Sequence, residues 1–191
     1  MLLSSFTADH IEAGCDEVGR GCLAGPVVAA AVILPKDYRH PLLNDSKQIL
    51  KADREALREE IIRDAIAWAV AEVDNEEIDR INILNASFKA MHIAIEKLHT
   101  KPSFLLIDGN RFKPYADIPY ECIIQGDGKF LSIAAASILA KTHRDDLMCR
   151  LAGKYPGYGW ETNVGYATLR HRDGIKQLGI TPYHRKSFAL L

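Results

Sequence analysis

Short apolar runs, each with polar residues on either side, predict the strands of this chain. The run VVAAAVIL at 27–34 has no polar position, so it predicts a strand that is too apolar to be half exposed. The runs FLLID and ECIIQ both stop at turns that contain glycine. The predicted strands are 10–15, 27–34, 66–73, 104–108 and 121–125.

The segments between these runs have the spacing of amphipathic helices. In 44–65 the apolar positions Leu50, Leu57 and Ile61 share one helical face, and Asp45 or Ser46 stands near the predicted start. The segment SIAAASILAKTHRDDLMCRL is rich in Ala and Ser, whose small side chains let a helix lie close to a sheet. The other predicted helices are a short and a longer one within 75–99 and one over about 166–178. Strands mixed with helices indicate an α/β layered domain.

The composition fits one globular domain that has a substantial core. The chain has 191 residues, of which 48% are hydrophobic, and no apolar run approaches the roughly 20 residues that a membrane helix needs. The first residues, MLLSSFTADH, lack the charged and apolar regions of a signal peptide, so we expect a cytosolic protein. Cys15, Cys22, Cys122 and Cys149 form no CxxC pair, so we expect reduced thiols and no zinc site.

Charge is divided unevenly along the chain. Residues 1–128 carry 14 Lys and Arg against 21 Asp and Glu, a net charge of −7, and residues 129–191 carry 10 against 4, a net charge of +6. A basic end on a nearly neutral protein suggests contact with a polyanion. On charge alone, an ordinary solvated surface is an equally good interpretation.

Acidic residues follow several of the predicted strands. Asp16 and Glu17 come at the end of the first strand, Asp108 ends the strand FLLID, and Asp127 follows the next strand. Such residues converge at one edge of an α/β sheet, which is where open sheets place their sites. Hard oxygen ligands without His or Cys suit Mg²⁺ or Mn²⁺, and a pair of such ions supports phosphodiester hydrolysis.

Adjacent strand residues point to opposite faces, which complicates this site. Asp16 and Glu17 cannot both direct side chains at one metal from a regular strand. Two alternatives stay open: the strand breaks at Glu17, or Glu17 contributes through its backbone carbonyl. A lone Asp-Glu pair is more often a solvated acidic pair, and only the other carboxylates favour a site here.

The segment GRGCLAGP after this pair is a flexible, positively charged loop. It does not match the phosphate-binding P-loop pattern. Its glycines allow the backbone to approach a ligand closely, and Arg20 could meet a phosphate.

These residues resemble the bacterial type 2 ribonucleases H, the ribonuclease HII family. The segment DEVGRGCLAGPV resembles the family signature, and further blocks match in order over nearly the whole chain. These blocks are LNDSK (43–47), LIDGN (106–110), GDGKFLSIAAASILAKTHRD (126–145), GYAT (165–168) and HRKSF (184–188). A chance match of six ordered blocks is implausible. The related ribonuclease HIII carries threonine at the position of Arg20 and an extra N-terminal domain.

The resemblance implies an RNase H-like fold, a mixed five-stranded sheet flanked by helices. It implies one catalytic domain over 1–191, in which about 150–191 form a C-terminal substrate-binding extension. It also implies an endonuclease that uses one or two Mg²⁺ or Mn²⁺ ions and cuts the RNA strand of RNA–DNA hybrids, and we expect it to act as a monomer. Such enzymes also cut on the 5′ side of single ribonucleotides in duplex DNA, leaving 3′-hydroxyl and 5′-phosphate ends.

The resemblance also assigns roles to residues. The metal-binding and catalytic carboxylates become Asp16, Glu17, Asp108 and Asp127. Gly19, Arg20 and Gly21 become the loop that recognises the ribose 2′-hydroxyl, and Tyr166 becomes the aromatic residue that packs on the adjacent deoxyribose. Two positions depart from the family: Cys22 replaces a usual proline, which puts the loop's rigidity in doubt, and Val164 replaces a common lysine, which puts one phosphate contact in doubt.

The basic residues near these blocks are candidates for phosphate contacts, because such contacts dominate duplex binding. They are Lys47, Lys141, Arg144, His184, Arg185 and Lys186. For each one singly, a structural ion pair or cap is an equally good interpretation.

Three other functions remain as alternatives. A nuclease of the same fold that acts on DNA junctions would use similar carboxylates but would need no reader of the 2′-hydroxyl. A non-catalytic nucleic-acid-binding module would be expected to have lost acidic residues. A glycosidase with paired carboxylates is the third and most remote alternative.

Overall fold

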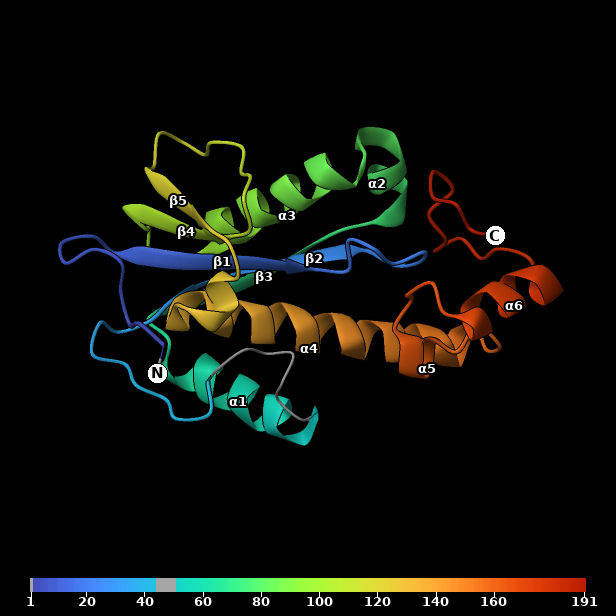
Figure 1. Cartoon of the computed structure of the whole chain (residues 1–191), viewed down its shortest axis with the longest axis horizontal. Helices are drawn as coiled ribbons and strands as arrows, with labels where there is room; N and C mark the ends of the chain where they lie inside the picture. Colours follow the sequence, from blue (N-terminus) through green and yellow to red (C-terminus); the bar gives the residue numbers. More distant parts are fainter. Residues whose placement is uncertain (1, 44–50) are drawn as a thin grey trace.

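The computed structural model describes residues 2–43 and 51–191. Five strands form one mixed sheet in the order β3-β2-β1-β4-β5 (Figure 1). The antiparallel strands are β1 (Glu12–Val18), β2 (Val27–Ile33) and β3 (Ala67–Val73), which form two successive antiparallel pairs. On the other side, β4 (Phe104–Asp108) runs parallel to β1, and β5 (Tyr120–Ile123) runs parallel to β4. The mixed five-stranded sheet that the family resemblance implies is confirmed.

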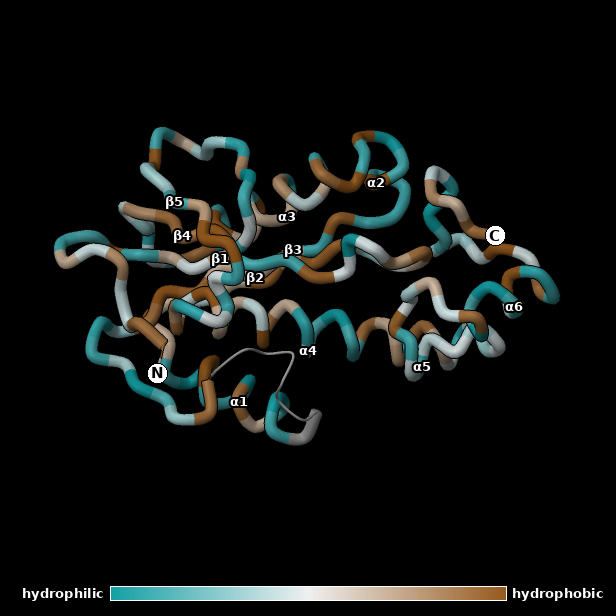
Figure 2. The backbone as a smooth tube through the Cα atoms, in the orientation of Figure 1, coloured by the Kyte–Doolittle hydropathy of each residue, from teal (hydrophilic) through white to brown (hydrophobic). Residues whose placement is uncertain are grey.

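Helices cover both faces of the sheet (Figure 1). One face packs against α3 (Ile83–Lys97), which follows the short α2 (Asn75–Ile81). The opposite face packs against α1 (Lys51–Asp64) and the first half of α4 (Leu131–Lys154). Figure 2 shows hydrophobic segments concentrated in the strands at the centre, with hydrophilic segments in the loops around them.

The long helix α4 lies directly on β1. A Cβ atom added to Gly14 of β1 would lie 2.3 Å from the backbone carbon of Ser132 in α4, so only glycine fits at this crossing. Buried alanines of α4 pack beside it against β2. The close approach predicted from the small side chains of this helix is therefore present.

The second half of α4 runs beyond the sheet into a separate apolar cluster (Figure 1). This cluster joins Met148 and Leu151 to Trp160 of α5 (Trp160–Asn163) and Ile175 of α6 (Leu169–Leu178). Residues of the segment that follows β1, Leu23 and Ala24, belong to the same cluster. The C-terminal elements thus pack around the loop that leaves β1.

Some predicted boundaries differ from the structure. β1 spans Glu12–Val18 rather than the predicted 10–15, so the alternative that the strand breaks at Glu17 is wrong. The predicted helix at about 166–178 begins at Leu169, because the Thr168 side chain accepts a hydrogen bond from the His171 N–H and caps it. The four-residue α5 was not predicted, and the proposed helix start at Asp45 or Ser46 lies outside the described residues.

The cysteines are free thiols, as predicted: Cys15 and Cys22 are buried, and Cys122 and Cys149 are half-buried. Over residues 2–43 and 51–191, the helices lack the combination of length and apolar character that crossing a bilayer requires.

Candidate functional site

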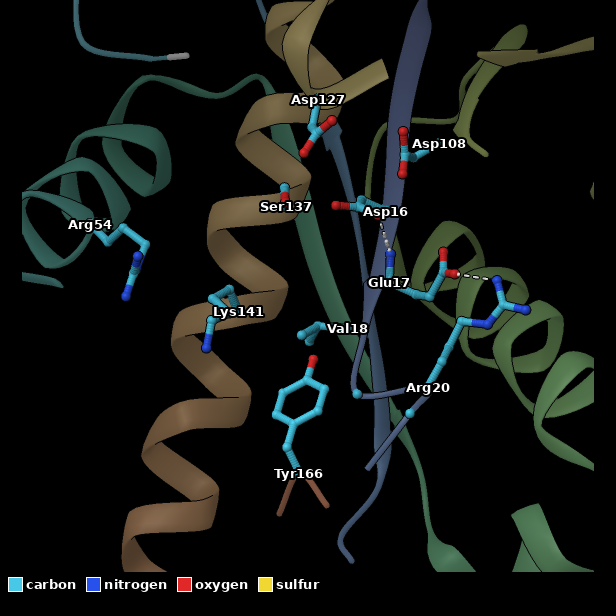
Figure 3. A pocket seen from close by; sticks show the side chains of 12 residues that line it. Asp16, Glu17, Val18, Arg20, Arg54, Asp108, Asp127, Ser137, Lys141 and Tyr166 are labelled. Carbon is cyan, nitrogen blue, oxygen red and sulfur yellow. Dashed lines mark hydrogen bonds and ion pairs between the residues drawn. The ribbon is translucent and has the colours of Figure 1, made fainter. Parts of the chain in front are cut away.

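A pocket of about 450 Å³ opens beside the last three residues of β1, which begin at Asp16 (Figure 3). It is bordered by β1, by the end of β4, by the connection between β5 and α4, and by α4 itself. Its lining residues are Asp16, Glu17, Val18, Gly19, Arg20, Gly21, Arg54, Asp108, Asp127, Ser137, Lys141 and Tyr166. All four predicted carboxylates, the predicted loop and the predicted tyrosine therefore line one pocket.

Asp16 is a buried carboxylate on the α4 face of β1, with only 7% of its surface exposed. Its side chain points toward α4 and accepts a hydrogen bond from Ser137 (Figure 3). Its Oδ1 also accepts the Glu17 N–H at 2.7 Å. Burial raises the pKa of Asp16 well above its usual range, and the negative charges of Glu17 and Asp108 raise it further. The site therefore places negative charge where a cation would be favourable.

Glu17 extends from the opposite face of β1, as strand alternation requires. Its Oε1 forms an ion pair with Arg20 Nη1 at 3.1 Å, in which the Arg20 side chain is 51% exposed (Figure 3). Burial raises the pKa of Glu17, and the Arg20 charge opposes that shift. Glu17 also lines a smaller pocket of about 270 Å³ beside α3, so its carboxylate stands at the boundary between two hollows.

A hydrogen bond from the backbone holds Asp108 close to the turn that carries Asp127. Asp108 is the last residue of β4, and its Oδ1 accepts the Gly126 N–H at 2.7 Å. Gly126 begins a short 3₁₀ helix, Gly126–Gly128, that carries the buried Asp127. A Cβ atom on Gly126 would lie 2.6 Å from Ile133 Cδ1, so the turn is tightly packed. This contact fixes Asp127 relative to Asp108 at the same end of the sheet.

The donor set suits a hard divalent cation. In the described part of the chain, no group of three or more His, Cys, Asp or Glu side chains is arranged so that it could hold a metal ion. Mg²⁺, however, commonly uses one or two carboxylates and completes its shell with water and substrate phosphate oxygens. Four carboxylates around one pocket, one of them destabilised by the charges of its neighbours, fit that mode of binding.

Tyr166 lies on the far side of the pocket from Asp108 and Asp127, and its hydroxyl points toward Val18 (Figure 3). Tyr166 lies in the turn before α6, and its backbone pairs with that of Cys22 through an isolated antiparallel β-bridge. Tyr166 is 41% exposed, which is unusual for a tyrosine that serves the core alone. The loop at 19–21 and this ring are therefore neighbours in space.

Three of the predicted phosphate contacts are placed elsewhere. Arg144, His184 and Arg185 have no exposed surface, so they do not lie where a phosphate could reach them; Arg144 and Arg185 donate to backbone carbonyls. Their basic character alone gave no sign of this burial.

The other predicted basic residues differ in placement. Lys141 does line the pocket, where its Nζ pairs with Asp145 Oδ1 at 2.5 Å. Lys186 is exposed and outside the pocket, while Lys47 lies outside the described residues.

Ser137 and Arg54 line the pocket and were not predicted from the sequence. Ser137 lies in the Ala- and Ser-rich part of α4, and its spacing from the carboxylates along the sequence does not identify it as a pocket residue. Arg54 lies on α1, whose charged residues gave no reason to single one out.

Comparisons with known proteins cover the whole chain. The family model described as Ribonuclease HII matches residues 13–191. A protein named Ribonuclease HII from Bacteroides fragilis (strain YCH46) is 64% identical over 191 residues, which is 100% of this chain and 95% of that relative. The crystal structure of the ribonuclease H2 from Pyrococcus horikoshii OT3 is similar with a TM-score of 0.80 and 26% identity, covering 94% of both chains. The structure of the PCNA:RNase HII complex from Archaeoglobus fulgidus is similar with a TM-score of 0.78 and 28% identity, covering 93% of this chain and 95% of that one.

Proposed function

Because the chain belongs to the ribonuclease HII family, we propose that its four carboxylates cut nucleic acid at ribonucleotides with the help of a divalent cation. The chain is a type 2 ribonuclease H, an endoribonuclease that cleaves RNA within RNA–DNA hybrids. Enzymes of this family use divalent metal ions.

The convergence of Asp16, Glu17, Asp108 and Asp127 on one pocket carries the proposal. These residues would hold one or two Mg²⁺ or Mn²⁺ ions, together with water and a phosphate of the substrate. On an ion shared with Asp16, Glu17 would take part through its backbone carbonyl, because the two side chains leave opposite faces of β1. When bound, such an ion supplies a more acidic water and neutralises negative charge on the leaving oxygen. Ser137 orients Asp16 and the Gly126 N–H orients Asp108, so both carboxylates are held before substrate arrives.

The reaction we propose is hydrolysis on the 5′ side of a ribonucleotide. The oxygen of a water molecule forms a bond to phosphorus and the water gives up a proton. The bond between phosphorus and the 3′ oxygen of the preceding nucleotide breaks, and that oxygen takes up a proton. The products carry a 3′-hydroxyl and a 5′-phosphate.

Choice of the cleavage point rests on the sugar. Backbone groups of the loop Gly19–Arg20–Gly21 can recognise a 2′-hydroxyl without preference for a base, because this group both donates and accepts. Tyr166 would pack on the deoxyribose 3′ to the ribonucleotide, where a 2′-oxygen would crowd the ring. Lys141 is a candidate for a phosphate contact beside them.

We further propose that the protein acts as a monomer in the cytosol on RNA–DNA hybrids and ribonucleotide-containing DNA. The test is incision of an end-labelled DNA duplex that contains one ribonucleotide, with and without Mg²⁺ or Mn²⁺. We expect one cation-dependent cut whose labelled product has a free 3′-hydroxyl, shown by extension with a polymerase. Equal incision of a ribonucleotide-free DNA junction would favour the junction nuclease instead.

A further inference from the structure

Two arginines are completely buried beneath the loop that leaves β1. Arg144 belongs to α4 and Arg185 to the segment after α6, and neither side chain has exposed surface. Burial, with a further contribution from the Arg144 charge, lowers the pKa of Arg185 to about 10, so it stays charged at neutral pH. Burying a guanidinium costs free energy unless its N–H groups are hydrogen-bonded. The acceptors of these two arginines therefore show which segments of the chain the arginines hold.

Arg185 donates to three carbonyl oxygens of one loop. Its Nη2 donates to Gly19 O at 2.7 Å, its Nη1 to Arg20 O at 2.8 Å and its Nε to Gly25 O at 3.0 Å. The guanidinium is planar and rigid, so these bonds fix where the three carbonyls point. Leu23 O also accepts the backbone N–H of Arg185 at 2.8 Å, which anchors the arginine to the same loop.

Fixing these carbonyls also fixes the neighbouring amides. In a trans peptide the N–H of a residue points opposite to the C=O of the residue before it. The carbonyls of Gly19 and Arg20 point inward to Arg185, so the N–H groups of Arg20 and Gly21 point away from it. Both residues line the pocket, so the buried arginine turns two amide donors toward any bound ligand.

Arg144 joins this loop to the segment that carries Tyr166. Its Nε and Nη2 donate to Pro26 O and Ala24 O, each at 3.0 Å, and its Nη1 donates to Val164 O at 2.7 Å. One guanidinium therefore spans the loop after β1 and the turn two residues before Tyr166. The separation between the loop amides and the tyrosine ring is set by this side chain and the adjacent β-bridge of Cys22 with Tyr166.

The glycine at position 19 agrees with this arrangement. Gly19 has a φ of 92°, and a Cβ atom there would lie 2.2 Å from Arg144 Nε. By contrast, a Cβ atom on Gly21 would meet nothing within 4 Å. Gly19 thus makes room for the buried arginine, whereas Gly21 leaves open the surface over which a ligand would lie.

We propose that Arg144 and Arg185 are positioning residues for sugar recognition: from below the loop they hold the Arg20 and Gly21 amides toward the pocket, at a set distance from Tyr166. This inference rests on the proposed function, because it assumes that the loop reads a ribose. It assigns to two basic residues a structural action on the loop in place of a phosphate contact.

The test is the effect of Arg185→Lys on sugar selectivity. Lysine keeps the charge, but a single ammonium group cannot reproduce the fork that reaches three carbonyls. The readout is the ratio of Kd values for an all-DNA duplex and for the same duplex with one ribonucleotide, measured in EDTA. We expect the ratio to fall about tenfold, equivalent to ~1.4 kcal/mol, while binding of the all-DNA duplex stays unchanged.

A matched control separates positioning from general loss of stability. Ile95→Val removes one methylene from the buried face of α3, at a residue that does not line the pocket, and should lower stability but leave the ratio unchanged. If the wild-type protein prefers the ribonucleotide duplex and Arg185→Lys retains that preference, the inference is overturned but the proposed function stands. A wild-type protein without any preference would overturn the proposed function and this inference together.

Amide hydrogen exchange of the wild-type protein keeps the inference testable even if the variant does not fold. The Leu23 N–H is bonded to Gly165 O and the Gly25 N–H to Tyr183 O, so both should be protected. The Arg20 and Gly21 amides should exchange fast in the free protein and become protected when the ribonucleotide duplex binds. Protection of these two amides in the free protein would contradict the inference.

Discussion

At the scale of single residues, the pocket depends on carboxylates that are held close together at a cost in charge repulsion. Asp16 is the clearest case, because burial and the charges of Glu17 and Asp108 all raise its pKa. Ser137 and backbone N–H groups offset part of this cost by hydrogen bonds to the carboxylates. A site that is strained in this way in the absence of a cation is suited to bind one.

Asp108→Asn should abolish incision, with a loss of ~100-fold or more, equivalent to about 2.7 kcal/mol of transition-state stabilisation. The amide oxygen can still accept the Gly126 N–H, so the turn to Asp127 survives, but an amide is a weaker ligand for a hard cation. Removing one negative charge beside Asp16 should leave the melting temperature unchanged or raised. A folded variant that cuts at nearly the wild-type rate would exclude Asp108 as a ligand.

Substitution of the two loop glycines should affect different properties, cleavage for Gly21 and stability for Gly19. Gly21→Ala places its methyl group in open space, so stability should stay within about 0.5 kcal/mol of wild type while incision at a ribonucleotide falls about tenfold. Gly19→Ala collides with Arg144 at a positive φ and should destabilise the fold itself by ~1–3 kcal/mol. Urea denaturation and single-turnover cleavage of both variants check this pair. Equal loss of all-DNA binding by Gly21→Ala would indicate a general phosphate contact.

At the scale of elements, the sequence predicted the strands well because their apolar runs are short and nearly uninterrupted. β4 matches its predicted bounds, and β2 and β3 differ by one residue at one end. The end of β1 was missed because Asp16 and Glu17, although charged, continue the ladder with β2. Burial of a carboxylate or an arginine depends on partners from distant segments, which is why Arg144 and Arg185 looked like surface residues in the sequence.

Tyr166 is held by the turn before α6 and by its β-bridge with Cys22, so its substitution tests the site where these two segments meet. Tyr166→Ala should lower junction cleavage by more than tenfold, on the order of 1.4 kcal/mol, because the ring no longer packs on the sugar. Tyr166→Phe should retain part of the activity. The comparison uses a duplex with one RNA–DNA junction and records melting temperatures alongside. A Tyr166→Ala protein that melts several degrees lower yet cuts normally when folded would show that the ring serves the core.

At the scale of the whole molecule, the C-terminal segment closes over the loop after β1 through buried polar groups. His184 lies beside His171 of α6, with 3.1 Å between their Nε2 atoms, and Trp160 Nε1 donates to His171 Nε2 at 2.9 Å. The His184 Nδ1 accepts the Thr181 N–H at 2.9 Å. Burial and the neighbouring His171 lower the pKa of His184 to about 4, and burial also lowers the pKa of His171.

This network predicts loss of stability in acid. The unfolded chain binds a proton at His184 near pH 6.5 and the folded protein only near pH 4, so the unfolding free energy falls as pH decreases through that window. The loss from His184 should reach about 3 kcal/mol by pH 4. His184→Gln should flatten the profile measured by urea denaturation, whereas His99→Gln, at an exposed histidine, should not. Identical slopes for wild type and His184→Gln would contradict this account.

The central claim is that one pocket combines cation-dependent hydrolysis with recognition of a ribose. The most direct measurement compares cleavage rates for two end-labelled duplexes that differ only in one 2′-hydroxyl, with Mg²⁺ or Mn²⁺ and with EDTA. We predict incision on the 5′ side of the ribonucleotide in the presence of the cation, and no cut in the all-DNA duplex or in EDTA. Incision of both duplexes at equal rates, or cleavage that persists in EDTA, would contradict the account.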